Sequence, residues 1–279
     1  MADRGHTVSA VMAGHVEDYL RLRRALGFNL RFEGQVLPQF VAYLDAVGTQ
    51  TVTVEAAVAW TRQSLDAQPV TLSHRLGAVR GFARYLATID PATEIPPTGL
   101  FGKQQRRIPY IYSSQEIVRL LAAAARLSPP LRAASYEALL GLLAVSGMRV
   151  GEACRLLRAD IDLAEGLIRI RHTKFDRDRL VPLHPSATKS LRGYARRRDR
   201  LCPHPRTDTF FISSIGTGLR HSSLNATFLA LLAEAGFPTA TGSRPRIHDL
   251  RHSLVVNTLI GWQRDGVDIA ARLPVLSTT

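Results

Sequence analysis

The sequence has only two cysteines among its 279 residues, Cys154 and Cys202, and neither lies in a CxxC motif or beside a histidine cluster with zinc-site spacing. This excludes a disulfide framework and a cysteine-based metal site, and we expect Cys154 to pack as a small buried residue. No run of eighteen apolar residues occurs, and the opening MADRGHTVSA has no apolar segment typical of a secretory signal. We therefore expect a cytoplasmic protein with no membrane partner.

Acidic residues are scarce relative to basic ones. The sequence has 36 Lys and Arg against 23 Asp and Glu, a net charge of +13, and its pI is about 10.7. A surplus this large indicates a polyanionic partner, and nucleic acid is the leading candidate. Between Arg155 and Arg200 the sequence has 13 basic and 6 acidic residues, so more than half of the surplus lies there. Charge this concentrated predicts a binding face.

The length and the helical breaks predict two domains. Helices are expected over about 8–26, 32–47, 54–66 and 72–88, separated at Gly27, Gly48 and Pro69, in an N-terminal helical domain of residues 1–90. Residues 91–112 hold four prolines and two glycines and are interpreted as a linker. Its basic residues Lys103, Arg106 and Arg107 suit a segment that follows a DNA backbone. A basic linker that serves solubility is the alternative.

The second domain is predicted to cover residues 113–279. Ser113 and Glu116 form a capping-box pattern before a helix, and the apolar helix that ends near Gly147 lacks a polar face, which places it in the core. Alternation over 167–171 and 179–183 predicts a β-hairpin. A later helix is expected to begin at a Ser222 cap and to end at Gly236. The fold class is therefore mainly α, with a small β-hairpin sheet.

Three segments carry candidate chemistry. In SGMRVGEACRLL, Arg149 and Glu152 are three residues apart and share one helix face, so the carboxylate can hold the guanidinium for bidentate contact with a phosphate. An exposed ion pair is the alternative interpretation. In RIHDLRHSLVVNTLIG, His248 and Arg251 share a face, and Lys174 lies near the turn of the predicted hairpin. These cations could converge on one anion.

The order GMRVGE, then TK in a hairpin followed by RLVPLHP, then HDLRH resembles the catalytic domain of the tyrosine recombinases, or phage-type integrases. The resemblance covers roughly residues 110–276. It implies a helical, SAM-like core-binding domain and a mixed α/β catalytic domain that together clamp double-stranded DNA in a C shape. It also implies site-specific recombination without a cofactor or metal, and a homo- or hetero-oligomer on DNA, tetrameric at synapsis.

The resemblance assigns a role to each matching residue. Arg149 and Arg251 would bind the scissile phosphate, and Lys174 would act as general acid toward the 5′ oxygen. His248 would assist proton transfer at the nucleophile, and Glu152 would orient the site. His252 is expected to be a packing residue. Further DNA contacts are expected from the other basic residues of the hairpin and of the loop before His248, namely Arg177, Arg179, Arg244 and Arg246.

The sequence departs from the family pattern at the nucleophile. The family places a tyrosine in a helical segment beyond the one that reads ARLPVLSTT here, but no tyrosine follows Arg251, and the last one is Tyr194. We expect a DNA binder with an incomplete active site, inactive alone, which a partner protomer could complete in trans. The alternatives are a truncated integrase that only binds DNA or regulates, and a decaying gene product.

A remote alternative is a metallohydrolase. In HDLRH, His248 and His252 are four residues apart with an acid after the first histidine, close to the HExxH pattern of zinc enzymes. Aspartate in place of glutamate, the lack of an obvious third ligand and the adjacent Arg251 argue against it.

Overall fold

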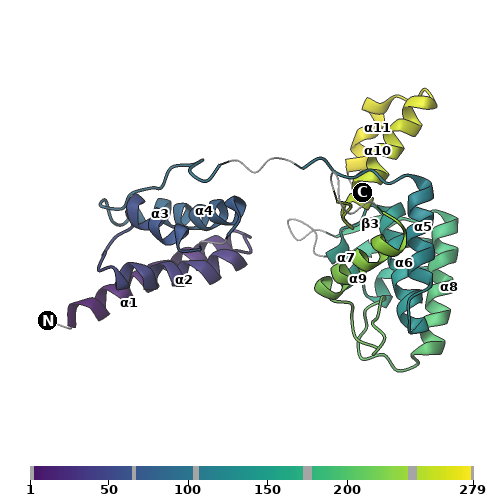
Figure 1. Ribbon diagram of the computed structural model, residues 1–279, viewed down its shortest axis with the longest axis horizontal. Coiled ribbons are helices and arrows are strands. Elements are labelled where there is room, and N and C mark those ends of the chain that lie inside the picture. The colour runs from purple at the N-terminus through teal and green to yellow at the C-terminus, as the bar shows by residue number, and fades with distance from the viewer. Residues whose placement is uncertain (1–2, 65–66, 103–106, 172–177, 238–243, 278–279) are drawn as a thin grey trace. The chain divides into compact units, whose positions relative to one another are not determined.

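The computed structural model describes residues 3–64, 67–102, 107–171, 178–237 and 244–277, and Figure 1 follows the chain through its helices and strands. The chain divides into two compact units, Met1–Arg106 (unit 1) and Arg107–Thr279 (unit 2). Each unit has its own hydrophobic core. The boundary falls inside the segment interpreted as a linker, so residues 91–102 belong to unit 1 and residues 107–112 to unit 2.

The described part of unit 1 contains four helices: α1 Asp3–Ala25, α2 Arg31–Ala46, α3 Val54–Arg62 and α4 Pro69–Leu86. Their inward faces bury a core that includes Leu37, Phe40 and Phe82. A break separates α3 from α4 as predicted, but Pro69 is the first residue of α4 and the break lies before it. Proline suits that position, since a backbone N–H in the first helical turn has no intrahelical acceptor.

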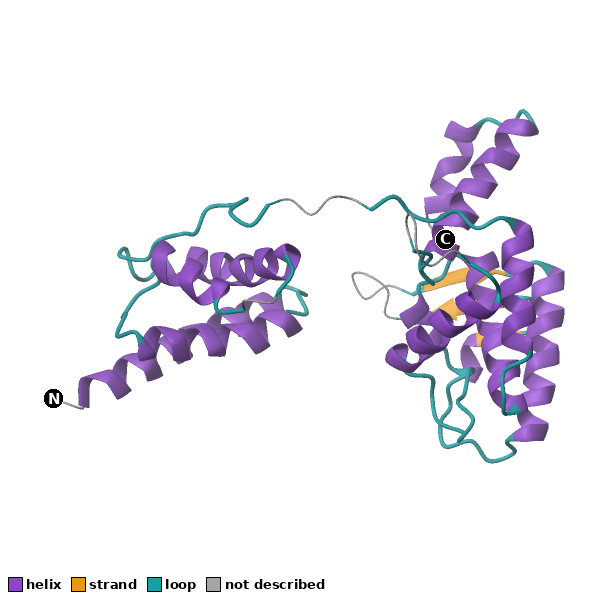
Figure 2. Cartoon of the chain, in the orientation of Figure 1, coloured by secondary structure: helices purple, strands orange, loops and turns teal. Residues whose placement is uncertain are grey.

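Unit 2 combines seven described helices with a small antiparallel sheet in the order β1-β2-β3 (Figure 2). In β2 and β3, Leu167 pairs with Pro182 and Ile170 with Arg179, which confirms the predicted hairpin. The mainly helical fold class is also confirmed. The helices are α5 Ser114–Ala125, α6 Pro130–Ser146, α7 Val150–Arg155, α8 Pro185–Leu201, α9 His221–Glu234, α10 Asp249–Arg264 and α11 Ile269–Ser277; β1 is Ile161–Asp162, β2 Leu167–Ile170, β3 Arg179–Pro182, and a 3₁₀ turn covers Arg158–Asp160.

Helix α6 is the centre of unit 2. Most of its residues are buried, as its uniformly apolar sequence predicts, and α5, α8 and α10 pack against it. It ends at Gly147, whose φ of 62° lies in the left-handed region that favours glycine. The chain therefore reverses direction there and delivers Arg149 to the start of α7.

Local caps follow the sequence in part. Ser113 and Glu116 form the predicted capping box, with Glu116 N donating to Ser113 Oγ at 3.2 Å and Ser113 N donating to Glu116 Oε2 at 2.9 Å. The predicted Ser222 cap was wrong, because the N-cap of α9 is Arg220 and Ser222 lies inside the first turn. Gly236 follows the end of that helix with a φ of 72°, and Cys154 is buried as expected.

Candidate active site

Arg149 and Glu152 are joined more firmly than an exposed ion pair would be. Arg149 is the N-cap of α7, and its backbone N–H donates to Glu152 Oε2 at 2.9 Å. Its Nη1 donates to Glu152 Oε1, also at 2.9 Å. The Glu152 side chain is only 6% exposed, whereas that of Arg149 is 50% exposed. A buried carboxylate therefore fixes a guanidinium that still faces solvent.

Arg179 of β3 binds the same carboxylate. Its Nη2 donates to Glu152 Oε2 at 3.0 Å, and its side chain is 20% exposed. Its Nε is buried, and no hydrogen-bond acceptor for it occurs within the described part of the chain. The sequence predicted a DNA contact for Arg179, but its link to Glu152 was not foreseen.

Arg251 of α10 completes the group of cations. Its Nη1 donates to the backbone carbonyl of Gly147, two residues before Arg149. Burial lowers the pKa of the Arg251 guanidinium, and so do the positive charges of Arg149 and Arg179. Arg149 and Arg179 thus bind the Glu152 carboxylate, and Arg251 lies close enough for its charge to interact with the same carboxylate. We call Arg149, Arg179, Arg251 and Glu152 the arginine cluster.

Glu152 stays ionised in this setting. Burial raises its pKa, but hydrogen bonds from the Arg149 backbone and side chain, together with the positive charges of Arg179 and Arg149, outweigh burial and leave the pKa below its ordinary value. The carboxylate therefore balances part of the positive charge and leaves a cationic site. Such a site is suited to an anion with several oxygens, such as a phosphodiester.

His248 lies directly before α10, beside the arginine cluster. Although it is exposed, partial burial lowers its pKa, as do the nearby His252 and Arg251. A neutral imidazole at neutral pH can accept a proton. His252 is exposed and packs its ring edge-on against His248, with centroids 5.1 Å apart. The adjacent Asp249 is buried and accepts a hydrogen bond from Arg246 N at 2.9 Å.

Tyr112 positions α10, although the sequence analysis did not single it out. The residue is completely buried; its backbone N–H donates to Ser253 Oγ at 2.8 Å, and its hydroxyl donates to the carbonyl of Arg246 at 3.1 Å. Asn257 Nδ2 donates to the Tyr112 carbonyl at 3.3 Å. The sequence signal that could have identified Tyr112 is its position as an aromatic residue at the end of a proline-rich segment.

A basic groove of about 530 Å³ lies next to His248. Arg107 donates a hydrogen bond to the Arg244 carbonyl, and both line the groove together with Arg246. Helix α9 contributes His221 and Asn225, which sequence reasoning missed. The described lining contains no acidic residue. The groove therefore brings together three of the predicted DNA contacts.

Four predicted site residues, Lys103, Arg106, Lys174 and Arg177, lie outside the described residues. Their roles stay predictions. Within the described ranges, no group of three His, Cys, Asp or Glu side chains is placed to hold a metal ion. The helices in those ranges also include none with the length and apolar character needed to cross a membrane.

Comparison with known proteins identifies the family. Residues 111–265 match the phage integrase family. An integrase/recombinase of Sinorhizobium fredii, y4rB, is 42% identical over 271 residues, which cover 94% of this chain and 86% of that protein. The chain belongs to the phage integrase family. The resemblance carried by the three motifs is thus confirmed.

One further relative and two solved structures are similar to this chain. Tyrosine recombinase XerC of Chlamydia caviae is 28% identical over 203 residues, 71% of this chain and 61% of that protein. The Tn1549 transposon integrase in complex with a circular intermediate DNA has the same fold, with a TM-score of 0.65, 13% identity and coverage of 95% and 90%. A lambda integrase tetramer bound to a Holliday junction gives a TM-score of 0.61, 17% identity and coverage of 93% and 75%.

Proposed function

We propose that this chain acts in site-specific recombination by binding duplex DNA and holding one backbone phosphate at the arginine cluster. The observation that carries the proposal is that Arg149 and Arg179 both bind the buried Glu152, while Arg251 is held beside them at the Gly147 carbonyl. Two guanidinium forks would bind the phosphate oxygens, and Arg179 would position Arg149 through their shared carboxylate.

The chemistry of strand exchange gives each group a task. Cleavage of a phosphodiester places extra negative charge on the phosphorus oxygens, and fixed guanidinium groups stabilise that charge. The leaving 5′ oxygen needs a proton, which the family resemblance assigns to Lys174. The nucleophile must lose a proton, and we assign this task to the imidazole of His248, whose pKa is lowered beside the cluster. The proposal thus assigns a residue of this chain to each step of the family's metal-free mechanism except the nucleophilic attack.

The described tyrosines of unit 2 are poor candidates for the nucleophile because their hydroxyls are engaged elsewhere. The hydroxyl of Tyr110 donates a hydrogen bond to Glu116. Burial is the larger cause and the Glu116 carboxylate the smaller cause that raise the pKa of Tyr110 to about 12. Tyr112 is buried against the Arg246 carbonyl, and burial raises its pKa further. The hydroxyls of Tyr136 and Tyr194 bond to the Ser223 carbonyl and to Ser135 Oγ. We propose that the 279-residue polypeptide forms no covalent intermediate by itself.

The basic groove would follow the DNA backbone on either side of the held phosphate. Arg107, Arg244 and Arg246 supply phosphate contacts, while His221 and Asn225 supply side chains that can hydrogen-bond to phosphate or base edges. The lambda integrase relative has been solved as a tetramer on a Holliday junction. We extend this assembly to the present chain, as an oligomer on DNA.

The test uses a nicked duplex of mixed sequence and the full chain. Binding should weaken steeply between low and physiological salt, because phosphate contacts release counterions. Denaturing gels should show no covalent protein–DNA adduct. An adduct formed by the full chain alone would overturn the incomplete-site part of the proposal. Binding that hardly changes with salt would overturn the phosphate-binding part.

A second candidate function is DNA binding without catalysis, whether the chain is alone or in an assembly. The hydrogen-bonded tyrosine hydroxyls favour this function as much as they favour a recombinase that a partner completes. Mixing this chain with a longer relative separates the two. The relative keeps its tyrosine but has both phosphate-binding arginines replaced by alanine, so it cannot cleave alone. An adduct in the mixture supports a recombinase completed in trans. Co-binding without an adduct supports a DNA-binding or regulatory protein.

A further inference from the structure

Helix α8 carries a row of exposed cations that the proposed active site does not use. Lys189, Arg192, Arg196 and Arg200 are spaced three and four residues apart, so they lie along one side of the helix. Arg197 lies next to this row and is also exposed. The opposite side of α8 is buried against α6. We call these five residues the α8 stripe.

The cations of the α8 stripe outnumber the acidic side chains around them. No described residue forms an ion pair with Lys189, Arg196, Arg197 or Arg200. The fifth member of the stripe, Arg192, donates a hydrogen bond only to the backbone carbonyl of Leu163. The one acid of α8 is engaged elsewhere. Asp199 accepts two hydrogen bonds from Arg158, at 2.6 and 2.7 Å. The stripe therefore presents cations that form no ion pairs with described residues, and Glu137 of α6, which lines a pocket with Arg197, is the acid beside them.

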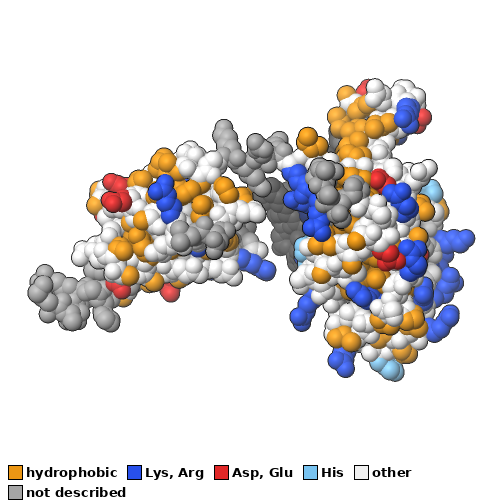
Figure 3. Space-filling view, viewed as in Figure 1, with side chains coloured by type: hydrophobic (Ala, Val, Ile, Leu, Met, Phe, Trp, Pro, Cys, Tyr) orange, Lys and Arg blue, Asp and Glu red, His pale blue; other side chains and the backbone are white. Residues whose placement is uncertain are grey.

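The stripe lies apart from the arginine cluster. In unit 2, α8 forms one edge, and α7 and α9 lie toward the other side of the domain (Figure 1). Lys and Arg side chains gather along the α8 edge in the space-filling view (Figure 3). The basic groove is lined from Arg107, α7, α9 and residues 244–248, whereas the surface pockets beside the stripe are lined from α6 and α8. The two surfaces share no lining residue.

The dimensions of the stripe fit a nucleic-acid backbone. At a rise of about 1.5 Å per residue, Lys189 and Arg200 are about 16 Å apart along the helix axis. One strand of duplex DNA carries about five phosphates over that length. The residues between the cations and α6 are small, including Ser186, Ser190 and Gly193. Small side chains let a backbone approach closely, and serine hydroxyls can donate to phosphate oxygens.

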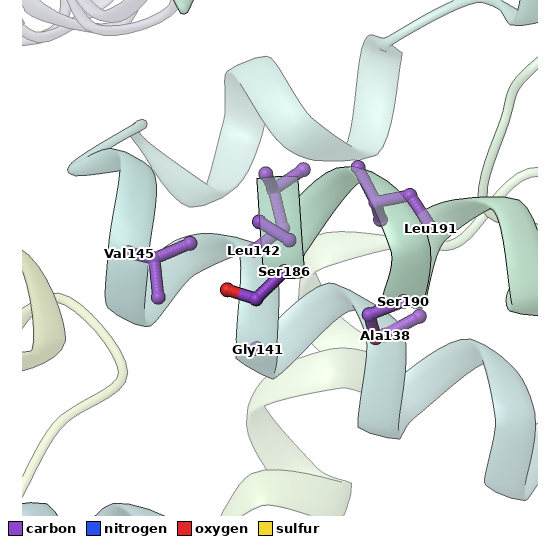
Figure 4. Close-up of a pocket in the computed structure, with 8 residues that line it drawn as sticks. Ala138, Gly141, Leu142, Val145, Ser186, Ser190 and Leu191 are labelled. Carbon is purple, nitrogen blue, oxygen red and sulfur yellow. The ribbon is translucent and has the colours of Figure 1, made fainter. Parts of the chain in front are cut away.

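An acidic helix of a partner protein is the competing occupant, and the adjoining surface suits it less well. Figure 4 shows the pocket between α6 and α8, which has a volume of about 150 Å³ and is lined by Ala138, Gly141, Val145 and Ser186 among others. Helix-in-groove binding needs apolar pockets for several anchor side chains. This pocket is below the usual range of about 300–1,000 Å³ for binding cavities. The row of cations is the stronger feature.

We propose that the α8 stripe is a second, sequence-independent binding surface for duplex DNA. One chain can then hold one duplex at the arginine cluster and a second duplex along α8. This surface contacts only the phosphate backbone, so its affinity depends on charge and salt and not on base sequence.

Lysine footprinting tests this directly, because the sequence has only three lysines, Lys103, Lys174 and Lys189. The full chain is acetylated with and without excess mixed-sequence duplex of about 30 base pairs, and modification is read by mass spectrometry. Lys189 should be protected by the duplex at low salt and released at high salt. Protection of Lys174 with unchanged reactivity of Lys189 would overturn the proposal while leaving the phosphate-binding site intact. An acidic helical peptide that protects Lys189 where DNA does not would also overturn it.

A bridging assay gives the second readout. Donor- and acceptor-labelled duplexes brought together by the chain should give energy transfer. In the variant K189Q/R196Q/R200Q the energy-transfer signal should fall by about tenfold or more. The slope of log affinity against log salt concentration should fall by about three, one for each lost phosphate contact. The control R119Q/R264Q/R272Q removes the same charge from exposed positions elsewhere on unit 2 and should bridge normally. Equal bridging by both variants would contradict the proposal, with circular dichroism establishing that each is folded.

Discussion

Arg179 on β3 donates from Nη2 to Oε2 of Glu152 on α7 at 3.0 Å, and this bond joins the sheet to the helix whose start carries Arg149. Glu152 also accepts hydrogen bonds from the backbone and the side chain of Arg149. One buried carboxylate thus sets the positions of two arginines. Changes at Glu152 should affect both stability and phosphate binding.

Glu152→Gln should destabilise unit 2 by about 1.5–3 kcal/mol at neutral pH, because a buried carboxylate loses charge-assisted hydrogen bonds. Urea denaturation measures this, followed by the fluorescence of Trp262 in a Trp60→Phe background, since the sequence has only these two tryptophans. The exposed Glu165→Gln is the matched control and should change stability by less than about 0.5 kcal/mol. Equal effects of the two substitutions would show that the carboxylate is not structural.

The contribution of Glu152 should also depend on pH. Its pKa in the folded chain is lowered, so the ionised form stabilises the fold above the unfolded carboxyl pKa of about 4.3. This stabilisation is lost as the pH falls through the lower, folded value. The stability difference between the natural chain and Glu152→Gln should therefore shrink below about pH 4. Denaturation curves at several pH values measure it, and a difference that grows on acidification would contradict the assignment.

Arg149→Ala should weaken binding of a nicked duplex by about ten- to a hundredfold, the range expected for a lost charge-assisted contact. The slope of log affinity against log salt should fall by about one. Fluorescence anisotropy at several salt concentrations gives both values. Arg264→Ala, an exposed arginine at the end of α10, is the control and should leave the slope unchanged. If both variants bind alike, Arg149 does not contact phosphate.

Ser253→Ala should loosen the attachment of α10. Ser253 Oγ accepts from the buried Tyr112 N–H at 2.8 Å, and its loss leaves that donor without its partner. A buried unsatisfied N–H costs about 1–3 kcal/mol. Faster hydrogen exchange of the Tyr112 amide and of α10 peptides should follow, with exchange in unit 1 unchanged as the internal control. Unaltered exchange at Tyr112 would show that another acceptor replaces Ser253.

The sequence identified the local part of the arginine cluster and missed its long-range part. Arg149 and Glu152 are three residues apart, and their contact follows from helix geometry alone. The bond from Arg179 depends on the placement of β3 against α7, which no local pattern encodes. The convergence of Arg251 with Arg149 was inferred from the charge pattern, and the family resemblance gave Arg251 its role at the phosphate. Glu152 was expected from the sequence to hold Arg149, but its second bond, to Arg179, required the fold.

The same distinction explains the caps and the groove. The Ser113–Glu116 capping box lies within one turn and was predicted. The start of α9 was misplaced because serine is a good cap wherever it occurs, while the tertiary packing of this helix begins it one residue after Arg220. His221 and Asn225 of α9 join the basic groove only when α9 packs near residues 244–248. Their spacing carries no signal by itself.

His248 should titrate below the ordinary histidine value of about 6.5, because partial burial and the nearby His252 and Arg251 disfavour its charged form. The neutral form then stabilises the fold above about pH 6.5, and this contribution is lost as the pH falls through the lower folded pKa. NMR titration of the imidazole resonance that disappears in His248→Gln measures the midpoint. A bound duplex should raise the midpoint, since a phosphate beside the ring favours the imidazolium.

His204→Gln, at an exposed residue away from the groove lining, is the control and should leave the His248 midpoint unchanged with and without DNA. A midpoint that DNA does not move would place the phosphate away from His248 and remove its role in proton transfer.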